Sequence, residues 1–225
     1  MARRGESAKV RKSYGHPCLI AQALDLLGDR WTLLIIRDLM TGLHRYSEVL
    51  ASCSSMSPNV LSDRLKRLEA EGLVTRNYER GLPPKVEYHL TDKGWAVKPI
   101  LVSLLDFSRE HVIDGDPPLD QMPVDFVIRV VPTFAFQEHR AQDVEAVFAV
   151  EIDDCGPSNI WSFRIENGKL LPKRGEYPEP DLRLRTSSEG FLRYIRGSES
   201  AEQCGEVRGS SELARAVQEC FASSA

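Results

Sequence analysis

The feature that most constrains the fold is an amphipathic helix expected between Ser57 and Gly72. Ser57 is a favourable N-cap, and Pro58 suits the first helical turn, where its missing N–H has no partner to lose. Leucines at positions 61, 65 and 68 fall on one face, so this face is expected to be buried. Gly72 can adopt the left-handed conformation that ends many helices. The polar residues between the leucines are left to face outward.

The elements around this helix have a recognisable order. A short helix precedes it and a hairpin follows it, and helix, turn, helix, hairpin is the order of a winged helix-turn-helix domain. The expected helices are 18–28, 31–41, Tyr46 to Cys53 and Thr91 to about His111; the hairpin strands are Leu73 to Arg80 and Lys85 to Leu90. We expect Pro99 to kink the last helix or weaken one of its turns.

This arrangement suits DNA because the major groove admits one α-helix that presents short polar and basic side chains. The wing would meet phosphates, which fix position, while base contacts give sequence choice. The candidate DNA-binding residues are Arg45, Ser57, Pro58, Asn59, Ser62, Lys66 and Arg67 near or on the second helix, and Arg80 and Lys85 on the wing. A solvated polar face that binds nothing is the alternative for Lys66 and Arg67.

Residues 14 to 112 resemble the HxlR family of winged-helix regulators. The matching segments are His16-Pro-Cys18, Leu26 to Leu39, Gly42, Arg45-Tyr-Ser-Glu48, Ser57 to Leu73 and Pro83 to Gly94. The resemblance implies a homodimer, paired through its first and last helices, that reads an inverted-repeat operator. It also implies a redox or electrophile switch at Cys18, for which a small buried side chain is the alternative. Asp63 departs from the family pattern, which more often has a longer uncharged or basic residue at this position. An acid near phosphates is unfavourable, so a phosphate contact is not expected there.

The second half of the chain changes character. Alternating apolar residues predict strands at 144–152, at 161–165, and around Leu182 and Leu184, with a hairpin turn at Asn167-Gly168. Thr186 to Glu189 is expected to cap a helix, and Ser210 or Ser211 another. Residues about 144–221 are similar to the sterol-carrier-protein type-2 fold, which implies an apolar cavity. Its candidate ligand-binding residues are Phe148, Trp161, Phe163, Phe191 and Tyr194, with plain core packing as the alternative.

Composition and charge narrow the functional classes. Residues 1–115 carry 17 basic and 14 acidic side chains, and residues 116–225 carry 12 and 19, so the first half is the better match for an anionic partner. The five cysteines form no CxxC pair, which disfavours a structural zinc site or a disulfide framework. Neither a secretory signal nor a membrane span is expected, so the cytoplasm is the default location. Nucleotide-loop and hydrolase motifs are missing, and we expect neither an enzyme nor a cofactor.

We therefore expect an α+β chain. Its parts are an N-terminal arm (1–13), a winged helix-turn-helix domain (14–112), a linker (113–123) and a sterol-carrier-like domain (124–225). The expected function is a transcription regulator that binds double-stranded DNA as a homodimer, modulated by a hydrophobic small molecule or by thiol oxidation. The alternative is a carrier of hydrophobic molecules in which the winged domain serves only for dimerisation.

Overall fold

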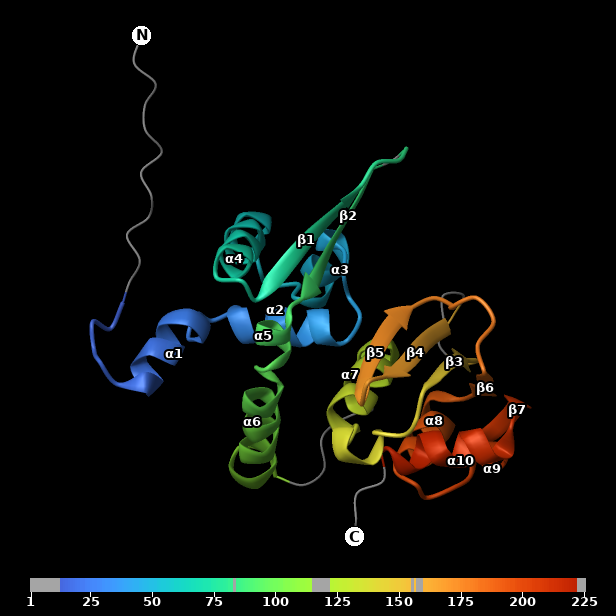
Figure 1. Cartoon of the computed structure of the whole chain (residues 1–225). Helices are drawn as coiled ribbons and strands as arrows, with labels where there is room; N and C mark the ends of the chain where they lie inside the picture. Colours follow the sequence, from blue (N-terminus) through green and yellow to red (C-terminus); the bar gives the residue numbers. More distant parts are fainter. Residues whose placement is uncertain (1–12, 83, 115–121, 155, 157–159, 222–225) are drawn as a thin grey trace.

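The computed structural model describes residues 13–82, 84–114, 122–154, 156 and 160–221 (Figure 1). Residues 1–12 of the expected N-terminal arm, residues 115–121 of the expected linker and Cys155 lie outside these ranges. The first half contains α1 (Leu19–Leu27), α2 (Thr32–Met40), α3 (Tyr46–Ser52), α4 (Pro58–Ala70), β1 (Val74–Glu79), β2 (Lys85–Leu90), α5 (Asp92–Trp95) and α6 (Lys98–His111). Strands β1 and β2 pair antiparallel and project from the helices as the wing (Figure 1). The winged helix-turn-helix prediction is confirmed.

Local sequence accounts for the ends of these helices. The Ser57 hydroxyl accepts a hydrogen bond from the backbone N–H of Val60, as expected for an N-cap, and Gly72 has a φ of 71°. The single helix predicted from Thr91 to His111 is instead two helices. Thr91 caps α5 by accepting from the N–H of Gly94, and Pro99 lies in the first turn of α6, where a new helix tolerates proline.

The second half is an α+β unit built on a five-stranded sheet of order β5-β4-β3-β6-β7, in which only the β3–β6 pair is parallel. Its elements are α7 (Val124–Ala135), the 3₁₀ helix η2 (Glu138–Arg140), β3 (Ala146–Ile152), β4 (Ile160–Glu166), β5 (Lys169–Arg174), β6 (Leu182–Thr186), α8 (Ser188–Ile195), α9 (Ala201–Cys204), β7 (Gly205–Gly209) and α10 (Ser211–Glu219). Helices α8, α9 and α10 lie together beside the sheet (Figure 1). Ser187, rather than Thr186, caps α8 by accepting from Gly190 N–H.

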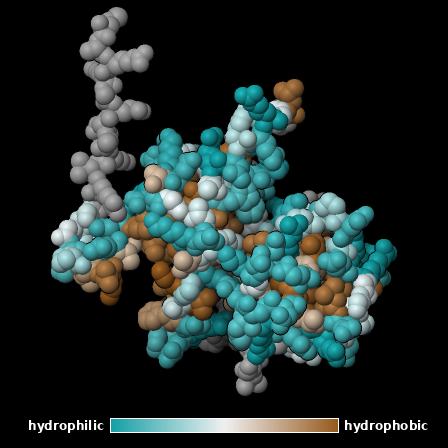
Figure 2. Space-filling view, in the orientation of Figure 1, coloured by the Kyte–Doolittle hydropathy of each residue, from teal (hydrophilic) through white to brown (hydrophobic). Residues whose placement is uncertain are grey.

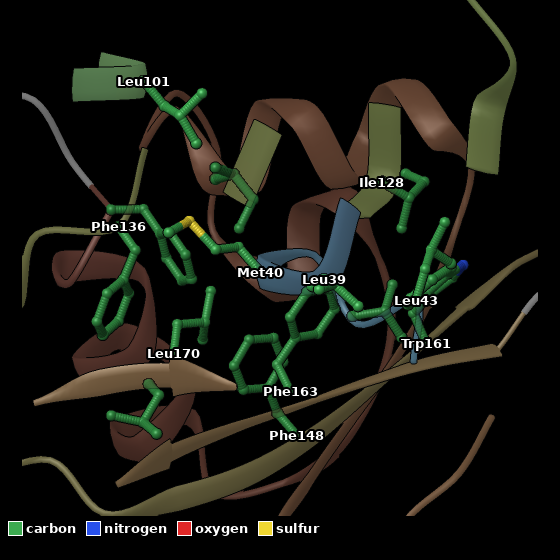
Figure 3. Close-up of a cluster of buried hydrophobic side chains, with 14 of the residues drawn as sticks. Leu39, Met40, Leu43, Leu101, Ile128, Phe136, Phe148, Trp161, Phe163 and Leu170 are labelled. Carbon is green, nitrogen blue, oxygen red and sulfur yellow. The ribbon is translucent and has the colours of Figure 1, made fainter. Parts of the chain in front are cut away.

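The two halves share one hydrophobic core. Leu39 and Met40 at the end of α2, with Leu43 just beyond it, point into the same cluster as the aromatic residues of the sheet (Figure 3). All three are 3% exposed or less. Helix α7, which the sequence did not predict, contacts β5 and α8 and carries Ile128 into this cluster. Continuous apolar burial of this kind couples the stability of the winged half to that of the sheet.

A buried polar network reinforces this junction. Arg129 on α7 is 2% exposed, and its Nη1 lies 3.1 Å from Oδ1 of Asp38 on α2, which is fully buried. The same guanidinium donates to the Thr41 hydroxyl and, at 2.7 Å, to the Ser52 hydroxyl. Burial lowers the pKa of Arg129, and the Asp38 carboxylate opposes this effect. A buried guanidinium needs such partners, so its position specifies how α7 docks on α2.

The backbones of the two halves also come close at one glycine. Gly42 has a φ of 88°, and a Cβ placed on it would lie 2.6 Å from the carbonyl oxygen of Pro172 on β5. Such a distance is below any normal van der Waals contact, so only glycine permits this approach.

Candidate nucleic-acid interface

Contacts between α3 and α4 set the angle of the second helix. The Tyr46 hydroxyl donates to the carbonyl oxygen of Pro58 at 2.6 Å and lies 3.2 Å from the Ser62 hydroxyl. Beneath these bonds, Val49 and Leu61 are fully buried. The first turn of α4 is therefore held from its inner side, and its outer side is left to solvent.

The predicted groove face on α4 is largely as expected. Ser57, Pro58, Asn59 and Lys66 are exposed, while Ser62 is half-buried because it contacts Tyr46. The helix dipole places partial positive charge at the N-terminal turn, where unpaired N–H groups favour an anion. Phosphate and base edges can both approach this turn.

Arg67 needs a correction. Its guanidinium is ion-paired with Asp29 and donates to the carbonyl oxygen of Asp25. Arg64, one turn earlier, pairs with the same Asp29 carboxylate at 2.7 Å. These contacts fasten α4 to the α1–α2 connection, so Arg67 holds the helix in place rather than facing a groove. Asp29 is 38 residues away from Arg67 in the chain, so no local sequence pattern could predict this pairing.

On the wing, the two predicted basic residues differ. Arg80 is exposed where β1 ends. Lys85 is engaged, with its ammonium 2.9 Å from Glu87 and 3.7 Å from Glu79. The hydrogen bond to Glu87 raises the pKa of Lys85. Arg76, which the sequence analysis did not single out, is exposed on β1 and adds a further cation to the wing.

Arg45 lies where α3 meets the wing. It is exposed, and its backbone N–H donates to the Glu48 carboxylate at 2.9 Å, which caps α3. Arg45 forms an isolated β-bridge with Glu87, and the N–H of Tyr88 donates to the His44 carbonyl at 2.8 Å. Burial, helped by neighbouring His89, lowers the pKa of His44 to about 4. These contacts therefore tie the start of α3 to strand β2 of the wing.

Cys18 is the exposed N-cap of α1. Backbone N–H groups of Ala21 and Ile20 lower its pKa, since they stabilise the thiolate. Cys53, by contrast, is buried beside Asp38, and burial raises its pKa to about 11. Thiolate chemistry is therefore favoured at Cys18 and not at Cys53. The response of Cys18 to oxidants stays a prediction.

The five residues predicted to line a ligand cavity form a packed core. All are 2% exposed or less. The Phe148 and Phe163 rings stack at 4.9 Å, Phe191 lies 6.1 Å from Phe163, and the Tyr194 hydroxyl donates to the Ala214 carbonyl at 2.6 Å. Trp161 fills the end of the cluster near Leu43 (Figure 3). Core packing, the alternative interpretation, describes their positions.

The described residues contain neither a metal-site cluster nor a helix suited to a membrane. Within the ranges given above, no cluster of three or more His, Cys, Asp or Glu side chains has the arrangement of a metal site. Of the helices in those ranges, none combines the length and the apolar character that crossing a membrane requires.

Comparison with known proteins supplies independent evidence for the first half. The sequence profile described as HxlR-like helix-turn-helix matches residues 26–115. The uncharacterized HTH-type transcriptional regulator YvaP of Bacillus subtilis is 43% identical over 91 residues, which are 40% of this chain and 84% of YvaP. The uncharacterized HTH-type transcriptional regulator sll1512 of Synechocystis is 36% identical over 90 residues, 40% of this chain and 67% of the relative. The solved reduced form of the B. subtilis regulator YodB is 34% identical, with a TM-score of 0.39, and covers 45% of this chain and 100% of YodB.

Proposed function

The chain belongs to the HxlR-like helix-turn-helix family, and from that premise we propose that it is a transcription regulator that binds double-stranded DNA as a homodimer. Helix α4 enters the major groove with Ser57, Pro58, Asn59 and Lys66, and the wing follows the adjacent phosphates with Arg80. The observation that carries the proposal is the first turn of α4, which is fixed from within by Tyr46 and open to solvent outside.

Exposed apolar side chains on α1 and α6 support the homodimer. Leu19 is 80% exposed and Ile20 71% on α1; Leu104 is 46% exposed and Phe107 56% on α6. Hydrophobic surface gathers over this side of the molecule (Figure 2). Large apolar patches on soluble domains mark interaction surfaces, and a twofold contact here would bury them. Its two recognition helices would read half-sites about 34–36 Å apart in an inverted repeat.

Modulation of DNA binding has two proposed routes. One is oxidation at the exposed Cys18, beside the proposed dimer contact, where a new bond or charge would alter the pairing of α1. The other is a small molecule bound by the second half of the chain, whose shared core with α2 can transmit a change. The likeness of the second half to sterol carriers remains part of this proposal.

The carrier hypothesis is less well supported. A carrier needs an apolar interior with room for cargo, and the ring cluster of Phe148, Phe163 and Phe191 fills the predicted place. The carrier hypothesis also gives no role to the exposed Asn59 at the start of α4 or to Arg80 on the wing.

The experiment is a titration of the purified chain against the DNA upstream of its own gene, with random DNA as competitor, at two salt concentrations. We expect competitor-resistant binding and a log–log salt slope of several, since each neutralised phosphate contributes about −0.9 to the slope. Binding no tighter than to random DNA, in reduced and oxidised protein alike, would contradict the proposal.

A further inference from the structure

A cavity of about 940 Å³ lies between the wing and the sheet. One wall comes from the winged half, with residues from the end of α2 to the start of α3 and from β2, and the other from β4, β5 and the segment that follows β5. Its size is in the range of small-molecule sites in proteins, which commonly lie between two structural units. None of the five predicted cavity residues lines it.

The cavity lining combines apolar and charged side chains. Its apolar lining comes from both halves and includes Leu39, Met40, Leu90, Trp95, Ile160, Leu171 and Pro172. Four basic side chains, Arg45, Lys85, Lys173 and Arg174, and two carboxylates, Glu48 and Glu87, also line it. A ligand with an apolar body and one charged group would therefore match the residues that line the cavity.

The two carboxylates that line the cavity already have hydrogen-bond or ion-pair partners within the protein. Glu48 accepts from the Arg45 backbone at 2.9 Å, and Glu87 is shared between Lys85 at 2.9 Å and His89 at 3.4 Å. Lys85 is thereby matched, and Arg174 pairs with Asp125 at 3.1 Å.

The remaining charge is positive and comes from opposite walls. Among the residues that the structure describes, no carboxylate lies within ion-pair distance of the Arg45 or Lys173 side chain. Lys173 packs over the Tyr177 ring, with its ammonium 4.5 Å from the ring centroid. Arg45 is exposed at the start of α3. Two unmatched cations on one cavity favour an anion.

We propose that this cavity is an effector site for an amphipathic organic anion, whose carboxylate binds Arg45 and Lys173 and whose apolar body packs on Leu171, Pro172 and the end of α2. The effect of this anion on DNA binding rests on the proposed function. Arg45, the N-cap of α3, is also a candidate DNA-binding residue, so an anion bound there competes with DNA. Effector and DNA then weaken each other's binding by the same factor.

The binding test uses 2-naphthoate and decanoate as anionic probes and 2-naphthamide as the neutral counterpart, measured by isothermal titration calorimetry on the full chain without DNA. We expect at least one anion to bind in the submillimolar range and the amide to bind at least tenfold more weakly. Lys173→Gln should weaken the anion at least tenfold. Lys169→Gln is the matched control on the same strand, because Lys169 pairs with Asp92 at 3.2 Å and lies outside the cavity lining.

Three results would overturn the site: neither anion binds, the amide binds as well as the naphthoate, or Lys169→Gln weakens binding as much as Lys173→Gln. The regulatory step has its own readout. The anion that binds should weaken upstream-DNA binding several-fold in the wild-type chain and not in Lys173→Gln, at equal ionic strength. Anion binding without DNA binding by the free protein would contradict the proposed function and leave the site standing; DNA binding unaffected by a bound anion would contradict the regulatory role.

Discussion

Gly42→Ala tests the close contact between the two halves of the molecule. The substitution has two costs. A left-handed backbone costs a residue with a Cβ about 1–2 kcal/mol, and φ at Gly42 is 88°. The new Cβ would also lie 2.6 Å from the oxygen and 2.8 Å from the carbon of the Pro172 carbonyl, both backbone atoms. Overpacking that forces backbone shifts costs about 1–3 kcal/mol. We therefore expect a loss of about 2–5 kcal/mol in the free energy of unfolding.

Gly72→Ala is the matched control. Gly72 has a φ of 71°, and nothing lies within 4 Å of a Cβ placed there, so this variant carries only the backbone cost of about 1–2 kcal/mol. The gain from a less flexible unfolded chain is the same in both variants and cancels in the comparison.

The assay is urea denaturation of both variants and the wild type, followed by far-UV circular dichroism and by tryptophan fluorescence. Because the halves share a core, the two signals should report one transition, with Gly42→Ala less stable than Gly72→Ala by about 1–3 kcal/mol. Equal losses in the two variants, or separate transitions for the two halves in the wild type, would refute the reasoning.

Three further predictions concern buried charge, pH and thiols. Asp38→Asn should cost up to about 3–5 kcal/mol in urea denaturation, because buried Arg129 then keeps only the more distant and partly exposed Asp125 carboxylate, at 3.7 Å. Arg129→Met should cost less, since Asp38 keeps Arg37 at 2.8 Å. The pKa of His44 falls to about 4 in the folded chain, so below pH 6.5 the unfolded chain binds a proton that the folded chain does not. The free energy of unfolding should therefore fall by about 2–3 kcal/mol from pH 6.5 to 4. His44→Gln should reduce this dependence of stability on pH, and an unchanged dependence would contradict the assignment. With Ellman's reagent at pH 7.5, Cys18 should react faster than Cys53, so Cys18→Ser should remove a faster phase than Cys53→Ser does; the opposite order would contradict this.

Local signals in the sequence predicted the winged half well. The Ser57 cap, the leucine stripe and Gly72 each act within one helix, and all three behave as expected. Arg67 was misplaced because its partner, Asp29, lies in a distant part of the chain. Periodicity shows which side of a helix is polar, and it cannot show which polar side chains other elements will occupy.

The second half was predicted less completely for a related reason. Apolar and polar residues alternate clearly in β3 and β4, so both strands were expected. Helix α7 follows directly after a proline-rich segment and was not predicted. The docking of α7 on α2 depends on the ion pair between Arg129 and Asp38. The sequence gives no sign of this pair, because the two residues meet only in the folded chain. The cavity next to the wing is likewise formed by several segments that lie far apart in the sequence, and no pattern within any one of them predicts it.

The central claim is that α4 reads bases while the wing holds phosphates, and the ratio of operator to random-DNA affinity tests it most directly. Asn59→Ala should lower this ratio, since a base contact is worth about 1–3 kcal/mol of discrimination. Arg80→Ala should weaken binding to both DNAs by about the same factor and reduce the salt slope by about two, because each protomer of the proposed homodimer loses one phosphate contact. If both variants lower the ratio equally, or if neither changes DNA binding, the assignment of α4 and the wing is wrong.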